Sequence, residues 1–184
     1  MRKRGDPTAS SSSRCHSCRG VFPDMAGTTH RYMSSSAGCW AVYGDVLARE
    51  YADPEYGAVH ALTVDCYALQ HPGDPSPQSI GSVSTHLMRM CATLERGLDA
   101  AAPPSGMKLA PKEVRDLWWL DPPAELGRIT VLDVHAASSA EAHSEAVLTW
   151  ATSLWNAWSD HQDQARRWLD AYARNGRLLR GGGA

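Results

Sequence analysis

The chain has 184 residues, of which 43% are hydrophobic and seven are tryptophan, so it is long and apolar enough to fold around one sizeable core. Its formal charge of −2 gives no global field that would attract nucleic acid or an anionic membrane, so neither is an expected partner. There is no run of 18 apolar residues, and no apolar segment follows the basic N-terminus, so we expect a soluble cytoplasmic protein.

Both ends of the chain have the composition of disordered tails. Residues 1–14 are basic and rich in serine without an apolar anchor, and residues 176–184 contain a run of three glycines. Between them we expect an irregular segment over 15–38, interrupted by glycine, proline and serine, and a helical domain over 39–175. The irregular segment has few apolar residues, so something other than apolar burial must hold it together.

Three helices are predicted in the first half of the helical domain. The first runs over about 38–52 with Ser36 as its N-cap, and the second runs over about 54–70 with a proline at its first position. The loop HPGDPSPQ ends the second helix. A third helix starts after Ser76, and Gly97 provides its C-terminal stop.

The second half begins with a proline-rich connection, in which a short helix is predicted from Pro111 through Trp119. Capping-box spacings then mark helix starts at Thr130, Ser138 and Ser159. The last two helices carry apolar stripes at helical spacing, and no segment shows the alternation typical of strands. The sequence therefore predicts an all-α fold, a helical bundle with an irregular N-terminal segment.

A cluster of metal-binding side chains lies in the irregular segment. Cys15 and Cys18 form a C-x2-C pair, and His30 and Cys39 follow within the next 21 residues. Three thiolates and one imidazole suit the tetrahedral coordination of Zn²⁺, and a two-residue gap lets one tight turn present two sulfurs to the same ion. The sequence therefore predicts a structural zinc site that fixes this segment to the first helix.

Other interpretations of the cluster stay open. A thioredoxin-like redox pair opens a helix after a strand, and no strand is predicted before Cys15. The thiols could also be buried without a metal, and His16 is an alternative imidazole ligand. A zinc site closed by four protein ligands is generally structural, so it does not by itself make the protein an enzyme.

A second group of polar side chains is predicted between the second and third helices. His60, Tyr67 and His71 share one helix face, Asp65 lies on another face of the same helix, and His86 lies within the third helix. If the two helices pair in antiparallel fashion, these side chains approach one another and form a candidate catalytic pocket. Such a pocket could bind a second metal or place a histidine beside a carboxylate as a general base. The alternative is that each histidine makes an ordinary structural hydrogen bond.

The sequence also resembles a bacterial protein family of unknown function. The resemblance rests on the motifs CHSCRGVFPD, THRYM, GCWAVYGDVLAREY, VHALTVDCYALQHPG, PSPQSIGSVSTHL and LERG, and it covers about residues 15–172. The family brings no established reaction. The resemblance implies that the blocks containing both predicted sites belong to the family pattern, namely those with Cys15, Cys18, His30, Cys39, Asp65, His71 and His86.

Three functional hypotheses follow from the sequence. The first is a zinc-binding helical protein with a His/Asp/Tyr pocket that performs metal- or base-assisted chemistry on a small-molecule substrate. The second is a zinc-stabilised protein-interaction module without catalytic activity. The third is a nucleic-acid-associated zinc protein that uses the arginine-rich tail, although the overall charge does not favour it. The sequence decides neither the reaction nor the oligomeric state.

Overall fold

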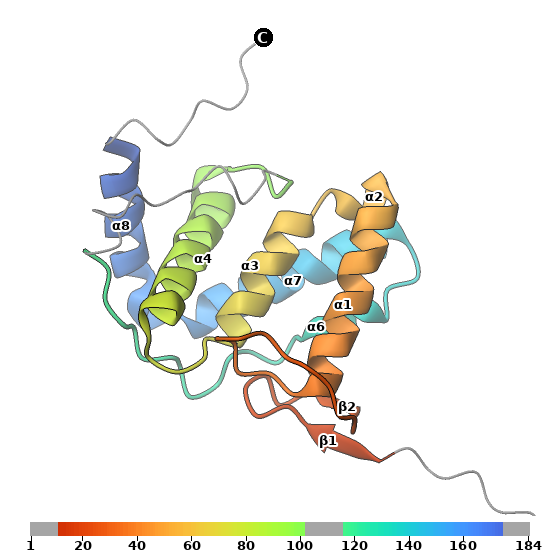
Figure 1. Cartoon of the computed structure of the whole chain (residues 1–184). Coiled ribbons are helices and arrows are strands. Elements are labelled where there is room, and N and C mark those ends of the chain that lie inside the picture. Colours follow the sequence, from red (N-terminus) through yellow and green to blue (C-terminus); the bar gives the residue numbers. More distant parts are fainter. Residues whose placement is uncertain (1–10, 102–115, 175–184) are drawn as a thin grey trace, which may run out of the picture.

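A computed structural model describes residues 11–101 and 116–174 (Figure 1). The fold is helical, which confirms the predicted all-α bundle, and one short two-stranded hairpin precedes the helices. The predicted tails, apart from residues 11–14, lie outside the described residues, as does most of the predicted helix between Pro111 and Trp119. The first part of the chain contains β1 (Ser12–Arg14), β2 (Val21–Pro23), α1 (Ala37–Ala52), α2 (Pro54–Gly57), α3 (His60–Gln70) and α4 (Pro77–Arg96). The second part contains α6 (Val131–His135), α7 (Ala140–Ala157), the 3-10 turn η2 (Ser159–His161) and α8 (Gln162–Arg174).

Local capping interactions set most of the helix ends, as the sequence predicts. The side chain of Ser36 accepts a hydrogen bond from the backbone N–H of Cys39 and begins α1, and Ser76 begins α4 in the same way. Gly97 ends α4 in the left-handed conformation with φ of 70°. Thr130 forms a complete capping box at the start of α6.

Three helix boundaries differ from the prediction. The helix expected over 54–70 is divided into α2 and α3, and the division follows Gly57, a residue with low helix propensity that lies close to the carbonyl of Glu50 on α1. Ser139 rather than Ser138 caps α7. The helix start expected at Ser159 is a 3-10 turn over Ser159–His161, and α8 begins after it at Gln162. Each difference is a shift or a break within a helical region.

The helices pack around α3, most of whose side chains are buried. Figure 1 shows α1, α3, α4 and α8 arranged side by side, with α7 crossing behind α3. Helix α3 contacts α4 and α7, α4 contacts α8, and α1 contacts α6. The core between them contains large side chains such as Leu62, Leu87, Trp150 and Leu154, all at most 1% exposed. Burial of this apolar surface supplies the main stabilisation of the bundle.

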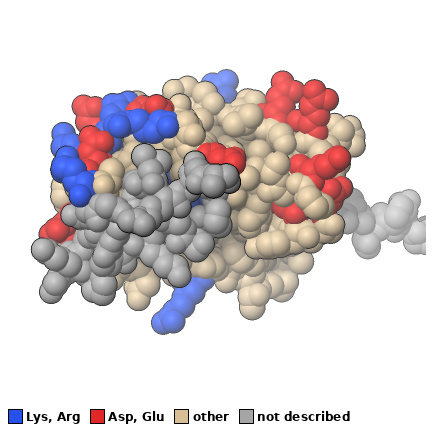
Figure 2. Space-filling view, turned by 90° about the horizontal axis from the view of Figure 1, so that it is seen from above, with Lys and Arg blue, Asp and Glu red and all other residues tan. Residues whose placement is uncertain are grey.

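Most charged side chains lie on the surface, and the buried exceptions in the described residues are Glu50, Asp65 and Arg89. On the face shown in Figure 2, basic and acidic side chains intermingle at one side, and acidic side chains gather at the other. Ion pairs join α4 to α8 on the surface, with Arg166 bound to Glu95 and Arg96 bound to Asp170. None of the described helices is long and apolar enough to cross a membrane.

The β-hairpin differs from the prediction of an irregular segment. Ser12–Arg14, which the sequence analysis assigned to the N-terminal tail, pair antiparallel with Val21–Pro23. The strands are only three residues long and contain one buried side chain, Phe22, so they show no alternation that a sequence pattern could detect. The hairpin lies at the end of the bundle where α1 begins and α3 ends (Figure 1).

Candidate metal centre

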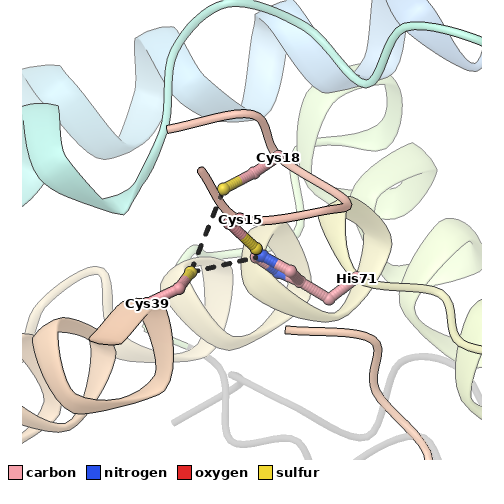
Figure 3. A group of neighbouring side chains, drawn as sticks. All are labelled: Cys15, Cys18, Cys39 and His71. Atoms are coloured by element: carbon pink, nitrogen blue, oxygen red, sulfur yellow. Dashed lines mark hydrogen bonds between the residues drawn. The ribbon is translucent and has the colours of Figure 1, made fainter. Parts of the chain in front are cut away.

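Three cysteines and one histidine converge at this end of the bundle. Cys15 and Cys18 lie on the turn between β1 and β2, Cys39 lies in the first turn of α1, and His71 directly follows α3 (Figure 3). All four side chains are buried, and their sulfur and nitrogen atoms lie within 4.8 Å of one another. This Cys3His group, defined by these four residues, could therefore hold a metal ion.

The turn between the two strands presents two sulfurs to one point. The N–H of Cys15 donates to the carbonyl of Gly20 over 2.9 Å, and the N–H of Arg19 donates to the carbonyl of Cys15 over 3.0 Å. Arg19 adopts a left-handed conformation with φ of 62°, which reverses the chain directly after Cys18. The two-residue spacing that suggested a metal site in the sequence thus becomes a tight turn that brings both thiols into the Cys3His group.

Two glycines allow the loops to approach the helix ends closely. A Cβ atom on Gly38 would overlap the carbonyl oxygen of Pro23, so only glycine lets β2 lie against the first turn of α1. Gly73 has φ of 74°, and a Cβ there would overlap the carbonyl oxygen of Tyr32. The contact at Gly38 places Cys39 next to the hairpin, and the contact at Gly73 places the segment just after His71 against the loop that contains Tyr32.

The ligand atoms are spaced as neighbours around a single centre. The Sγ atoms of Cys18 and Cys39 are 3.9 Å apart, and Sγ of Cys39 is 3.4 Å from Nε2 of His71. The other ring nitrogen of His71, Nδ1, donates a hydrogen bond to the backbone carbonyl of Tyr67 over 2.8 Å. Because Nδ1 carries the proton in this arrangement, Nε2 offers its lone pair to the centre.

The pKa values of the three thiols in the Cys3His group differ from one another. Hydrogen bonds from Cys18 and Cys39 lower the pKa of Cys15 below its usual range. The hydrogen bond to Cys15 raises the pKa of Cys18 to about 12, and hydrogen bonds to Cys15 and Cys18 raise the pKa of Cys39 still further. Three thiols packed together can share only one negative charge easily, so a bound cation is needed to ionise all three.

Tyr67 contacts two members of the Cys3His group. Its hydroxyl lies 3.5 Å from Sγ of Cys39, and its ring stacks on His71 with the ring centroids 4.1 Å apart. Burial raises the pKa of Tyr67 well above its usual range, so the phenol keeps its proton and can donate it toward a thiolate. Tyr43 stacks on the opposite side of Tyr67, with the ring centroids 3.8 Å apart.

Replacement of Tyr67 by phenylalanine should weaken metal binding while the fold is retained. The change removes the hydroxyl beside Cys39 but keeps the ring that packs between His71 and Tyr43. We expect roughly a tenfold loss of metal affinity, the lower end of the range for residues that support metal ligands. Competition with a chromogenic chelator measures the metal affinity of each variant. Tyr43→Phe is the matched control, and equal losses in the two variants would contradict the supporting role of the Tyr67 hydroxyl.

His30, the imidazole ligand predicted from the sequence, lies outside the Cys3His group. Its ring packs edge-on against Tyr32, with the ring centroids 4.3 Å apart, and lies tilted against Trp40, with the centroids 5.5 Å apart. Its buried Nδ1 has no hydrogen-bond partner in the described parts of the chain, and burial lowers the pKa of the ring. The structure places His71 in the position that the sequence analysis gave to His30.

The five residues of the predicted catalytic pocket separate into three places. His71 belongs to the Cys3His group, and Tyr67 supports it. Asp65 is fully buried between α3 and α4, where it accepts hydrogen bonds from Nδ1 of His86 over 2.7 Å and from Nε of Arg89 over 3.0 Å.

His60 belongs to a different buried network. Its Nδ1 bonds to Glu50 on α1 over 2.8 Å, and Glu50 also accepts hydrogen bonds from Thr63 and from Nε2 of His143. This network joins α1, α3 and α7. The sequence analysis assigned no role to Glu50 or His143, and their separation of 93 residues left no local signal that could have paired them.

The fold and the site together define a helical protein with a buried Cys3His group that could hold a metal ion. The model of DUF5946, a family of unknown function, matches residues 13–159, so the chain belongs to this family. The predicted membership of a family without an established activity is thereby confirmed. Comparison with curated proteins and with solved structures gave no match.

Proposed function

We propose that this protein binds one Zn²⁺ ion through Cys15, Cys18, Cys39 and His71, and that the ion fixes the N-terminal hairpin to the helical bundle. The spacing of the ligand atoms supports this proposal best. A tetrahedron with Zn–S bonds of about 2.3 Å and a Zn–N bond of about 2.1 Å has S–S edges of about 3.8 Å and S–N edges of about 3.6 Å. The corresponding distances here are 3.9 Å and 3.4 Å.

The donor set and its burial favour a structural role for the ion. Three thiolates and one imidazole are a typical zinc set, and soft thiolates disfavour Mg²⁺ and Ca²⁺. Catalytic zinc sites keep one position for water or substrate, whereas four protein ligands converge here and all are buried. The proposed function is therefore that of a zinc-stabilised helical protein.

The proposal of a catalytic His/Asp/Tyr pocket has less support. Asp65 and His86 bond to each other, His60 bonds to Glu50, and Tyr67 lies beside the metal ligands. Each polar side chain thus has a partner that accounts for its burial. The second hypothesis from the sequence, a protein-interaction module without catalytic activity, stays a prediction. It is compatible with the proposed zinc site.

The test is the metal content of the purified full-length chain. We expect elemental analysis to find one zinc per chain, and less than about a tenth of that in a Cys15→Ser, Cys18→Ser, Cys39→Ser triple variant, because each change removes a ligand. Cys91→Ser is the matched control, since this buried thiol lies outside the site and Glu95 can accept the new hydroxyl's hydrogen bond.

A second pair of variants identifies the imidazole ligand. His71→Ala should lower zinc retention against a competing chelator by at least about tenfold, whereas His30→Ala should leave retention near that of the unaltered chain. Protein without zinc, or zinc retained in the triple variant, would exclude the proposed site.

A further inference from the structure

One ligand of the proposed zinc site reaches a surface pocket. The pocket has a volume of about 560 Å³ and lies between residues 17–20 of the hairpin turn and residues 124–133 before and within α6. Of the four ligands, only Cys18 lines it. Cys18 is 5% exposed, whereas Cys15, Cys39 and His71 are fully buried.

We propose that Cys18 is a modification site, at which its zinc-bound thiolate accepts an alkyl group from a small uncharged electrophile in this pocket. The inference rests on the proposed zinc site. In the reaction, the thiolate sulfur supplies an electron pair to a carbon of the electrophile, an S–C bond forms, and the bond from that carbon to its leaving group breaks. The leaving group departs with the bonding pair as an anion, and Cys18 becomes a thioether.

The donor set makes the thiolates of such a centre electron-rich. Three thiolates and a neutral imidazole around Zn²⁺ leave a net charge of −1, and the thiolate is the nucleophilic form of cysteine. Cys39 is shielded because it is fully buried and lies beside the hydroxyl of Tyr67. Access therefore selects Cys18 among three chemically similar sulfurs.

The pocket lining favours an uncharged molecule. It contains two basic side chains, Arg19 and Arg128, and two acidic ones, Glu125 and Asp133, so its formal charges balance. Asp133 is already engaged in the capping box with Thr130. Ala124, Leu126 and Leu132 supply apolar surface, which suits a small neutral electrophile better than an anion or a cation.

The test uses the zinc-loaded full-length chain and iodoacetamide, which is small and neutral and releases iodide on alkylation. Peptide mass spectrometry of early time points should show Cys18 modified on the order of tenfold faster than Cys15 or Cys39, because thiolate reactivity follows exposure. Ala124→Trp, a change at an exposed residue of the pocket wall, should slow the reaction of Cys18 several-fold by filling the pocket. Ala171→Trp, at an exposed position on α8, is the matched control and should leave the rate unchanged.

The zinc content of the same samples separates the two proposals. Protein that contains no zinc would overturn the proposed function, and this inference with it. Zinc-loaded protein in which Cys18 reacts no faster than Cys15 and Cys39, or in which the two tryptophan variants react at the same rate, would overturn this inference alone.

Discussion

Removal of the proposed zinc is expected to unfold the N-terminal hairpin while the helical bundle persists. Residues 12–36 bury one large side chain, Phe22, besides the proposed ligands Cys15 and Cys18, so apolar burial alone cannot offset the entropy of ordering this segment. The bundle keeps its own core around α3. When free zinc is present at about a thousand times the dissociation constant of the site, its binding adds about 4 kcal/mol to the free energy of unfolding.

Hydrogen exchange measures the unfolding of the hairpin, and thermal unfolding measures the loss of stability that follows zinc removal. Amides of the hairpin, such as those of Cys15 and Arg19 that now bond within the turn, should exchange rapidly after chelation, while α7 stays protected. The midpoint of unfolding should fall by about 10 °C, and added zinc should restore it. Unchanged protection of the hairpin in metal-free protein would show that the ion does not hold this segment.

Replacement of Glu50 by alanine is expected to destabilise the bundle more than alanine substitution of any other charged residue on α1. The Glu50 carboxylate is fully buried and accepts hydrogen bonds from His60, Thr63 and His143. Without it, Nε2 of the fully buried His143 loses its partner, and its Nδ1 already has none among the described residues. Leaving such buried groups unsatisfied costs about 3 kcal/mol in the free energy of unfolding.

The same helix provides the control for this prediction. Asp45 also faces a histidine, with Oδ2 lying 3.8 Å from Nε2 of His135, but the Asp45 side chain is 72% exposed. Asp45→Ala should therefore change the free energy of unfolding by less than about 1 kcal/mol. Urea denaturation measures both variants. Equal costs for the two substitutions would show that burial of Glu50 is not what makes it important.

Local features were predictable because each depends on residues close together in sequence. Ser36 and Ser76 cap their helices through contacts three residues away, and Gly97 ends α4 because glycine readily adopts a positive φ. The paired sulfurs of Cys15 and Cys18 follow from their spacing in the same way. The helical class, the capped starts of α1 and α4 and the cysteine part of the candidate metal centre were therefore determined by the sequence itself.

The fourth member of the Cys3His group was decided only by the tertiary structure. His30 is nearer in sequence to the cysteines, but His71, which follows Cys39 by 32 residues, is the imidazole beside Cys39, because α3 ends at the hairpin. The separation of Asp65 from His60, and the meeting of Glu50 with His143, likewise depend on which helix faces each residue. Coordination and burial depend on distances in space, and these are fixed only when the helices pack.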